Sequence, residues 1–164
     1  NALVELGRFD QWHLVICGDG EDKQQVNEII EENSLRYNVD CVGYLADVSQ
    51  VMLNSDILVS PSVFEGMPNV PLEAMQIGLP CLLSDIPSHR WVIGGSDAAV
   101  FFNISRVDSL VKKIKLIIDG DIPLDDLSVK GKKIAARFVP EIMMEKYHKE
   151  YVNLLESKRK NVNG

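Results

Sequence analysis

Short apolar segments alternate with helical segments along this chain of 164 residues, and that alternation restricts the possible folds more than any other feature. Strand-like segments lie at residues 13–17, 39–45, 56–62, 81–85 and 98–102. Helical patterns lie at residues 21–34, 48–55, 88–94, 106–119, 124–138 and 140–157. This order predicts an α/β fold in which helices cover both faces of a parallel sheet. The length fits a single domain.

Loops rich in small or polar residues follow four of the predicted strands, at residues 18–20, 43–45, 60–68 and 84–87. The carboxyl ends of parallel strands meet at one edge of a sheet, and ligands bind beyond that edge. We therefore expect these four loops to line one cleft.

The segment FEGMPNVPLEAMQIGLP, residues 64–80, places two carboxylates in that cleft, on Glu65 and Glu73. Pro68 and Pro71 lie between them, and proline removes a backbone donor and clashes inside a helix. The sequence therefore predicts a loop that carries Glu65 and then turns into a helix.

Asn69 is the predicted cap of that helix, Glu73 is predicted in its first turn, and Gly78 with Pro80 ends it. The amides of a helix N-terminus bind anions readily. An anion site between two carboxylates that accept hydroxyl hydrogens suits a phosphorylated sugar or a nucleotide. Each acid also has a simpler interpretation, since Glu73 is favourable there through the helix dipole alone and Glu65 fits a solvated loop.

Other candidate sites are weaker. Gly18 and Gly20 resemble a dinucleotide fingerprint, but Lys23 replaces its third glycine, which disfavours NAD. His89 and Arg90 are predicted to be a pair on a helix surface rather than a catalytic dyad. Met52 and Met75 are predicted to lie in the core.

Charge is distributed unevenly. Residues 1–105 hold 15 acidic and 4 basic residues, whereas residues 106–164 hold 9 and 13. The acidic part argues against nucleic acid as a partner, because basic patches supply most of that affinity. The basic part suits a membrane surface or another domain, but solvated helix faces are the preferred interpretation.

Cysteine and histidine usage points to a reducing compartment without metal sites. Cys17, Cys41 and Cys81 lie in or beside apolar segments and form no C-x-x-C pair, so we expect buried free thiols and a cytoplasmic protein. The three histidines lack the spacing of metal ligands, and no metal is expected.

The stretches GDGEDK, VGYL and DILVSPSVFEGMPNVPLEAMQIGLPCLLSDIP together resemble the C-terminal half of the retaining glycosyltransferases of family 4. The resemblance implies the GT-B architecture, in which two Rossmann-like domains face one another. It implies that residues 1–164 are a single donor-binding domain, a fragment without its acceptor-binding N-terminal domain. The co-substrate it implies is a nucleoside-diphosphate sugar, with no cofactor or metal.

The resemblance also implies roles for individual residues. Glu65 is the predicted catalytic residue, which faces the donor sugar without acting as a covalent nucleophile, and Glu73 is predicted to bind the ribose. The remaining positions that match the family are Gly66, Met67 and Pro68 in the loop at the sugar, Asn69 and Val70 at the helix start that meets the diphosphate, Gly43, Tyr44 and Leu45 near the base, and Gly18 and Gly20 in the glycine loop.

The chain departs from the family in two respects. Members usually open this domain with a strand ending in glycine and arginine, followed by a lysine, and these basic residues grip the diphosphate. This chain starts after them, so we expect the sheet to lack its central first strand. The sheet then rearranges, a neighbouring chain fills the gap, or the region is marginally ordered. Trp91 is the second departure, because relatives often carry glutamate in that helix.

Transfer of a hexose with retention of anomeric configuration is the favoured function, and the fragment alone is expected to be inactive. The alternatives are a nucleotide-sugar 2-epimerase on the same architecture and a non-catalytic nucleotide-sugar-binding module. The amphipathic segment at residues 140–157 is expected to cross toward the N-terminal domain. In the fragment it would pack on its own domain or on a second copy, and the full enzyme is a candidate for peripheral association with the inner membrane face.

Overall fold

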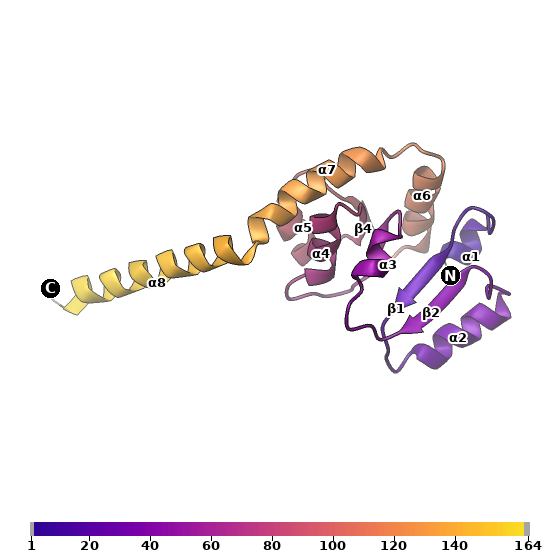
Figure 1. Cartoon of the computed structure of the whole chain (residues 1–164), viewed down its shortest axis with the longest axis horizontal. Helices are drawn as coiled ribbons and strands as arrows, with labels where there is room; N and C mark the ends of the chain where they lie inside the picture. Colours follow the sequence, from indigo (N-terminus) through magenta and orange to yellow (C-terminus); the bar gives the residue numbers. More distant parts are fainter. Residues whose placement is uncertain (1, 163–164) are drawn as a thin grey trace.

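In the computed structural model of the chain, five parallel strands alternate with helices, which confirms the α/β prediction (Figure 1). The structure describes the backbone of residues 2–162 and the side chains of residues 2–155. The strands are β1 (Leu14–Cys17), β2 (Val39–Gly43), β3 (Leu58–Ser60), β4 (Cys81–Ser84) and β5 (Val100–Phe102). Each falls inside a predicted strand segment, and each is shorter than predicted.

The helices are α1 (Ala2–Leu6), α2 (Lys23–Glu32), α3 (Ser49–Leu53), α4 (Asn69–Ile77), α5 (Pro87–Ile93), α6 (Val107–Ile118), α7 (Leu124–Ala135) and α8 (Pro140–Val162), with a 3-10 turn at Ala136–Phe138. In the described chain, α2 to α8 occupy the predicted segments between and after the strands, and α1 is a further helix that precedes β1.

The strands form two separate sheets. β1 pairs with β2, and β3, β4 and β5 form a second sheet in that order. In the described chain β1, β2, β3 and β5 therefore each have only one neighbouring strand. The chain therefore presents two small sheets rather than one continuous sheet.

The larger core lies around β4, the middle strand of the three-stranded sheet. All four residues of β4 are buried. Successive side chains of a strand point to opposite faces, so both faces of this sheet are covered, as predicted. Met52 and Met75 belong to this core, which confirms their prediction. α7 lies close against α4 at Gly131, where a Cβ would stand 3.2 Å from the Met75 Cγ.

A smaller core supports the two-stranded sheet. Ile30, Leu35 and Val39 form it, and Trp12 packs against them. The Trp12 indole Nε1 donates a hydrogen bond to the Gly7 carbonyl oxygen at 2.7 Å. α1 packs against α6, so the N-terminal part contacts a helix that follows the larger sheet. The two sheets are therefore joined through helices and not through strand pairing.

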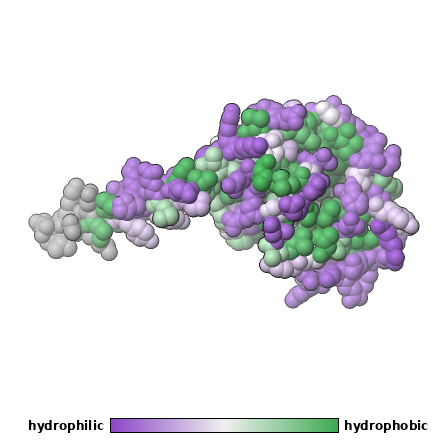
Figure 2. Space-filling view, in the orientation of Figure 1, coloured by the Kyte–Doolittle hydropathy of each residue, from purple (hydrophilic) through white to green (hydrophobic). Residues whose placement is uncertain are grey.

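α8 projects away from the rest of the chain as one long helix (Figure 1). Val139 is extended at φ −67° and ψ 148°, and this residue separates the 3-10 turn from Pro140, the first residue of α8. Apolar side chains such as Tyr147 and Tyr151 are exposed along α8, and Figure 2 shows green apolar surface between purple polar surface on the projecting helix. Of the described helices, none combines the length and apolar character needed to cross a membrane.

The prediction of buried thiols is right for one cysteine and wrong for two. Cys81 is buried in β4, whereas Cys17 and Cys41 are exposed. Cys17 ends β1, and Cys41 lies in β2, whose central residues are exposed because the two-stranded sheet is covered less completely. Burial raises the pKa of the Cys81 thiol to about 12.

Thiol labelling tests this arrangement. We expect 5,5′-dithiobis(2-nitrobenzoate) at pH 8 to modify Cys17 and Cys41 in the folded protein and to spare Cys81, because a buried thiol with a raised pKa is almost entirely protonated. The third thiol should react only after denaturant unfolds the chain. Labelling of Cys81 at the rate of the other two would contradict the burial of β4. The Cys17→Ser variant serves as the control that assigns the signals.

Candidate functional site

Glu65 lies in the loop between β3 and α4, as predicted. Its carboxylate is half-buried and accepts a hydrogen bond from the Ser62 hydroxyl, with 2.7 Å between Ser62 Oγ and Glu65 Oε1. Ser60, the last residue of β3, places its own hydroxyl 3.4 Å from that of Ser62. The loop therefore fixes one oxygen of Glu65 from within and leaves the other for a ligand.

The start of α4 differs from the prediction in one respect. Pro68, not Asn69, is the cap residue, and no side chain caps the helix. Asn69 is the first residue of α4, and its amide donates to the Met67 carbonyl oxygen at 2.9 Å in the turn that precedes the helix. Glu73 is consequently the fifth residue of α4, so its prediction in the first turn is wrong by one residue.

This geometry leaves few donors for an anion at the helix start. Asn69 donates to Met67, and Pro71 has no amide hydrogen. Within the described chain, the Val70 amide is the one donor of residues 69–71 without an acceptor. An anion at this end of α4 would meet the Val70 amide and the positive end of the helix dipole.

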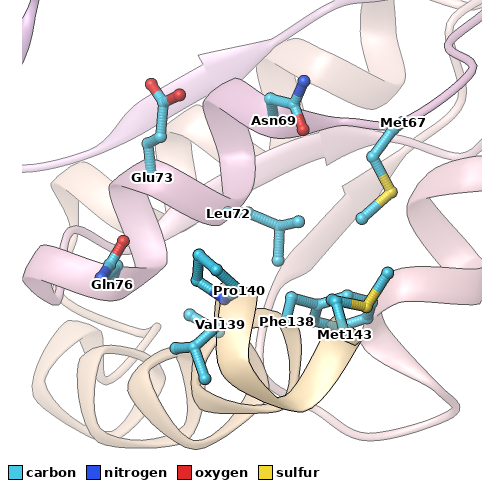
Figure 3. A pocket seen from close by; sticks show the side chains of 10 residues that line it. Met67, Asn69, Leu72, Glu73, Gln76, Phe138, Val139, Pro140 and Met143 are labelled. Atoms are coloured by element: carbon cyan, nitrogen blue, oxygen red, sulfur yellow. The ribbon is translucent and has the colours of Figure 1, made fainter. Parts of the chain in front are cut away.

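A cavity of about 330 Å³ gathers part of the predicted site. It lies between α4 and the junction of α7 with α8, and Figure 3 shows its lining. The residues that line it are Met67, Asn69, Leu72, Glu73 and Gln76 on one side and Ala135, Phe138, Val139, Pro140 and Met143 on the other. Leu72 lies between α4 and Met143, whereas the exposed Glu73 carboxylate projects away from them (Figure 3).

Three of the residues predicted to bind the sugar donor thus line this cavity: Met67, Asn69 and Glu73. Four others are outside its lining: Glu65, Gly66, Pro68 and Val70. Gln76 follows Glu73 by three residues on the same helical face, so helical spacing was a signal for it. Phe138 and Met143 gave no such signal, because only the tertiary fold brings them beside α4.

The predicted glycines form a second group, at the ends of β1 and β2. The Gly18 amide donates to the Gly43 carbonyl oxygen at 2.7 Å. Gly18 has φ +138° and Gly43 has φ +73°, conformations that side-chain-bearing residues rarely adopt. Gly20 donates to the Asp19 carboxylate beside it, and Tyr44 is exposed while Leu45 is half-buried. In residues 2–155, no hydrogen bond or ion pair joins this group to the α4 group.

His89 contradicts its prediction as a surface residue. It is completely buried, because α5 turns residues 89, 92 and 93 of one face toward the core. Arg90 is exposed and pairs bidentately with Asp85 at 2.7 and 2.8 Å. These hydrogen bonds lower the pKa of the Asp85 carboxyl. The two neighbours therefore have unrelated environments, and they form no dyad.

Trp91 lies outside the cavity that contains Glu73. It is exposed and meets the Phe138 ring edge-on, with 5.7 Å between ring centroids. Together with Arg137, Met143 and Tyr147 it lines a neighbouring cavity. Phe138 and Met143 line both cavities, and the Trp91 ring contacts Phe138, so Trp91 adjoins the α4 site through that shared wall.

Metal-ligand groupings are lacking in the part of the chain that the structure describes, where no three His, Cys, Asp or Glu side chains are placed to hold an ion.

Comparison with known proteins gives one family. The family model described as Glycosyl transferases group 1 matches residues 1–134. A UDP-Gal:alpha-D-GlcNAc-diphosphoundecaprenol alpha-1,3-galactosyltransferase of Escherichia coli is 26% identical over 121 residues, 73% of this chain and 31% of that protein. A lipopolysaccharide 1,6-galactosyltransferase of Salmonella typhimurium is 30% identical over 117 residues, 68% of this chain and 33% of that protein. The chain thus spans about a third of the length of these relatives.

Solved structures agree in fold. A glycosyltransferase from Rickettsia africae superposes with a TM-score of 0.82 at 17% identity, covering 94% of this chain and 42% of the other. The pneumococcal O-GlcNAc transferase GtfA, solved in complex with UDP and GlcNAc, superposes with a TM-score of 0.80 at 20% identity, covering 94% and 32%.

Substitution of Trp91 tests how much its contact with Phe138 stabilises the fold beside the site. We expect Trp91→Ala to lower the free energy of unfolding by about 1 kcal/mol, because an edge-to-face aromatic pair contributes about 0.5–1.5 kcal/mol. Urea denaturation measures the change. Tyr37→Ala is the control, since Tyr37 is 94% exposed, and should change little. Equal effects of the two substitutions would show that the Trp91–Phe138 contact contributes nothing to stability.

Proposed function

The chain belongs to the group 1 glycosyl transferases, and from that membership we propose that it is the donor-binding domain of a retaining hexosyltransferase. Its fold matches the C-terminal part of GT-B glycosyltransferases. The proposed co-substrate is a nucleoside-diphosphate sugar, from which the complete enzyme transfers the sugar to an acceptor with retention of anomeric configuration.

One observation supports this proposal most: the loop that carries Glu65 leads directly into a helix that presents a free amide at Val70 and a carboxylate at Glu73. In the proposed complex the diphosphate lies at the start of α4, where the dipole and the Val70 amide favour negative charge. Glu65 accepts hydrogen bonds from sugar hydroxyls, and Glu73 accepts them from the ribose.

The chemistry follows from where charge develops. Departure of a nucleoside diphosphate places negative charge on its phosphate oxygens, and preorganised donors at a helix N-terminus stabilise that charge. Neither Lys nor Arg is among the described residues that line the α4 cavity. We therefore propose that basic groups of the longer protein complete the diphosphate site. This chain alone should bind the donor weakly and should not turn it over.

Relatives suggest the nucleotide. The Escherichia coli relative is named for UDP-galactose, and GtfA was solved with UDP. We propose a UDP-hexose as the first candidate donor for this chain. The acceptor would bind to the N-terminal domain of the longer protein, and we propose that the exposed face of α8 packs against that domain. Three free thiols, two of them exposed, favour a cytoplasmic location.

Nucleotide binding tests the proposal. In the longest available form of the protein, a thermal-shift screen of UDP, GDP, ADP and their sugars should single out one nucleotide, since a ligand of the native state raises its apparent stability. Binding of none of them would contradict the proposed function. Binding without any transfer activity in the complete enzyme would favour a non-catalytic binding module.

Glu73→Ala should weaken binding of the selected nucleotide about ten- to hundredfold, because hydrogen bonds to a charged group contribute about 1.5–3 kcal/mol. Isothermal titration calorimetry measures the dissociation constant. Glu32→Ala is the matched control, since Glu32 is exposed at the end of α2, beside the other sheet, and is not among the residues that line the cavity. An unchanged affinity for Glu73→Ala would exclude the ribose role.

A further inference from the structure

A chain of buried hydrogen bonds connects the core side of α5 to the loop of Glu65. His89 Nδ1 lies 2.8 Å from the Ser84 carbonyl oxygen and 3.3 Å from the Ser84 hydroxyl. The Ser84 hydroxyl in turn lies 2.5 Å from the Ser62 carbonyl oxygen. Ser62 then donates through its own hydroxyl to Glu65. Ser84 and His89 are both completely buried.

The direction of each hydrogen bond follows from its acceptor. A carbonyl oxygen only accepts, so the Ser84 hydroxyl gives its single hydrogen to Ser62, and His89 Nδ1 carries the hydrogen that it gives to Ser84. The remaining lone pairs of the Ser84 hydroxyl face His89 Nδ1. His89 therefore holds Ser84, and Ser84 holds the backbone of the loop.

Packing alone does not explain a histidine at this position. Its neighbours on the same face of α5, Val92 and Ile93, are buried apolar residues. The Nε2 atom of His89 is buried and has no hydrogen-bond partner in the described part of the chain. An unpartnered buried polar atom costs about 1–3 kcal/mol, and an aliphatic residue would avoid that cost. What the imidazole provides, and an aliphatic side chain would not, is hydrogen bonding to Ser84.

The loop has little else to hold it. Within residues 2–155, two hydrogen bonds join loop residues 61–67 to parts of the fold outside the loop and α4: the long contact between the Ser60 and Ser62 hydroxyls at the end of β3, and the hydrogen bond from Ser84. Val63 and Phe64, in the middle of the loop, are 77% and 85% exposed. Of these two, the Ser84 contact is the shorter, and it is the one that ties the loop to β4, so the position of Glu65 depends strongly on it.

We propose that Ser84 and His89 are positioning residues for Glu65, which fix the loop so that its carboxylate meets the sugar of the donor. This inference rests on the proposed function, in which Glu65 faces the sugar and Glu73 the ribose. A purely structural role of the same residues, as a polar contact between β4 and α5, makes a different prediction, because it affects every part of the donor equally.

The test compares UDP with UDP-glucose in the longest form of the protein, by calorimetry. Ser84→Ala and His89→Leu should weaken UDP-glucose binding about five- to tenfold and change UDP binding less than about twofold, since one charge-assisted contact to the sugar is lost. His89→Asn, which retains a donor near the Nδ1 position, should restore most of the affinity. Ser55→Ala is the matched control, because the Ser55 hydroxyl, just after α3, also donates a part-buried hydrogen bond to a carbonyl, that of Val51 in α3.

A double-mutant cycle with Glu65→Ala separates positioning from stability. On the Glu65→Ala background, Ser84→Ala should cause no further loss of UDP-glucose affinity, because residues that act through one another are not additive. Equal weakening of UDP and UDP-glucose, or an additive loss in the double variant, would overturn the proposal. If Ser84→Ala or His89→Leu does not fold, failure of the folded His89→Asn variant to bind UDP-glucose would also overturn it.

A ligand-free measurement distinguishes failure of this inference from failure of the proposed function. Ser84→Ala should raise amide hydrogen exchange in the peptide of residues 61–68 at least about fivefold, while Ser55→Ala leaves it unchanged. If the unsubstituted protein binds neither UDP nor UDP-glucose, the proposed uridine donor is wrong, and the exchange result still decides whether Ser84 fixes the loop. Unchanged exchange in Ser84→Ala would reject that role.

Discussion

The burial of β4 is the constraint on which the larger half of the molecule depends. Its four residues are buried on both faces, and α4, α5 and α7 pack around it. The close approach of α7 to α4 is allowed by Gly131, which leaves room for Met75. α4 therefore holds a fixed place above the strand ends, and the loop before it can present Glu65 from a rigid base.

The elements and their order followed from the sequence, because apolar runs such as CLLS and helical spacing such as that around Met75 are local signals. The two glutamates were also placed correctly in kind, one in a loop and one on a helix, since Pro68 and Pro71 exclude a continuous helix. The exact start of α4 was not predicted correctly. The turn in which the Asn69 amide donates to Met67 depends on backbone geometry that the composition does not encode.

Long-range features escaped sequence analysis for a different reason. The residues next to His89 and Cys41 in sequence predict neither the burial of His89 nor the exposure of Cys41. Each depends on which other elements cover that face of the helix or strand. The cavity wall formed by Phe138 and Met143 lies more than sixty residues from α4 in sequence. The division into two sheets likewise emerges only when the pairing partners of β1 and β3 are known.

The division into two sheets leaves β1, β2, β3 and β5 each with one edge whose backbone groups have no strand partner in the described chain. β1 reads LVIC, without the charged residues or proline that usually protect such an edge. Strand edges without a partner template pairing between molecules. Self-association through β-strands is accordingly the main solubility hazard of this chain when it is handled alone, and dilution and edge charges are the natural remedies.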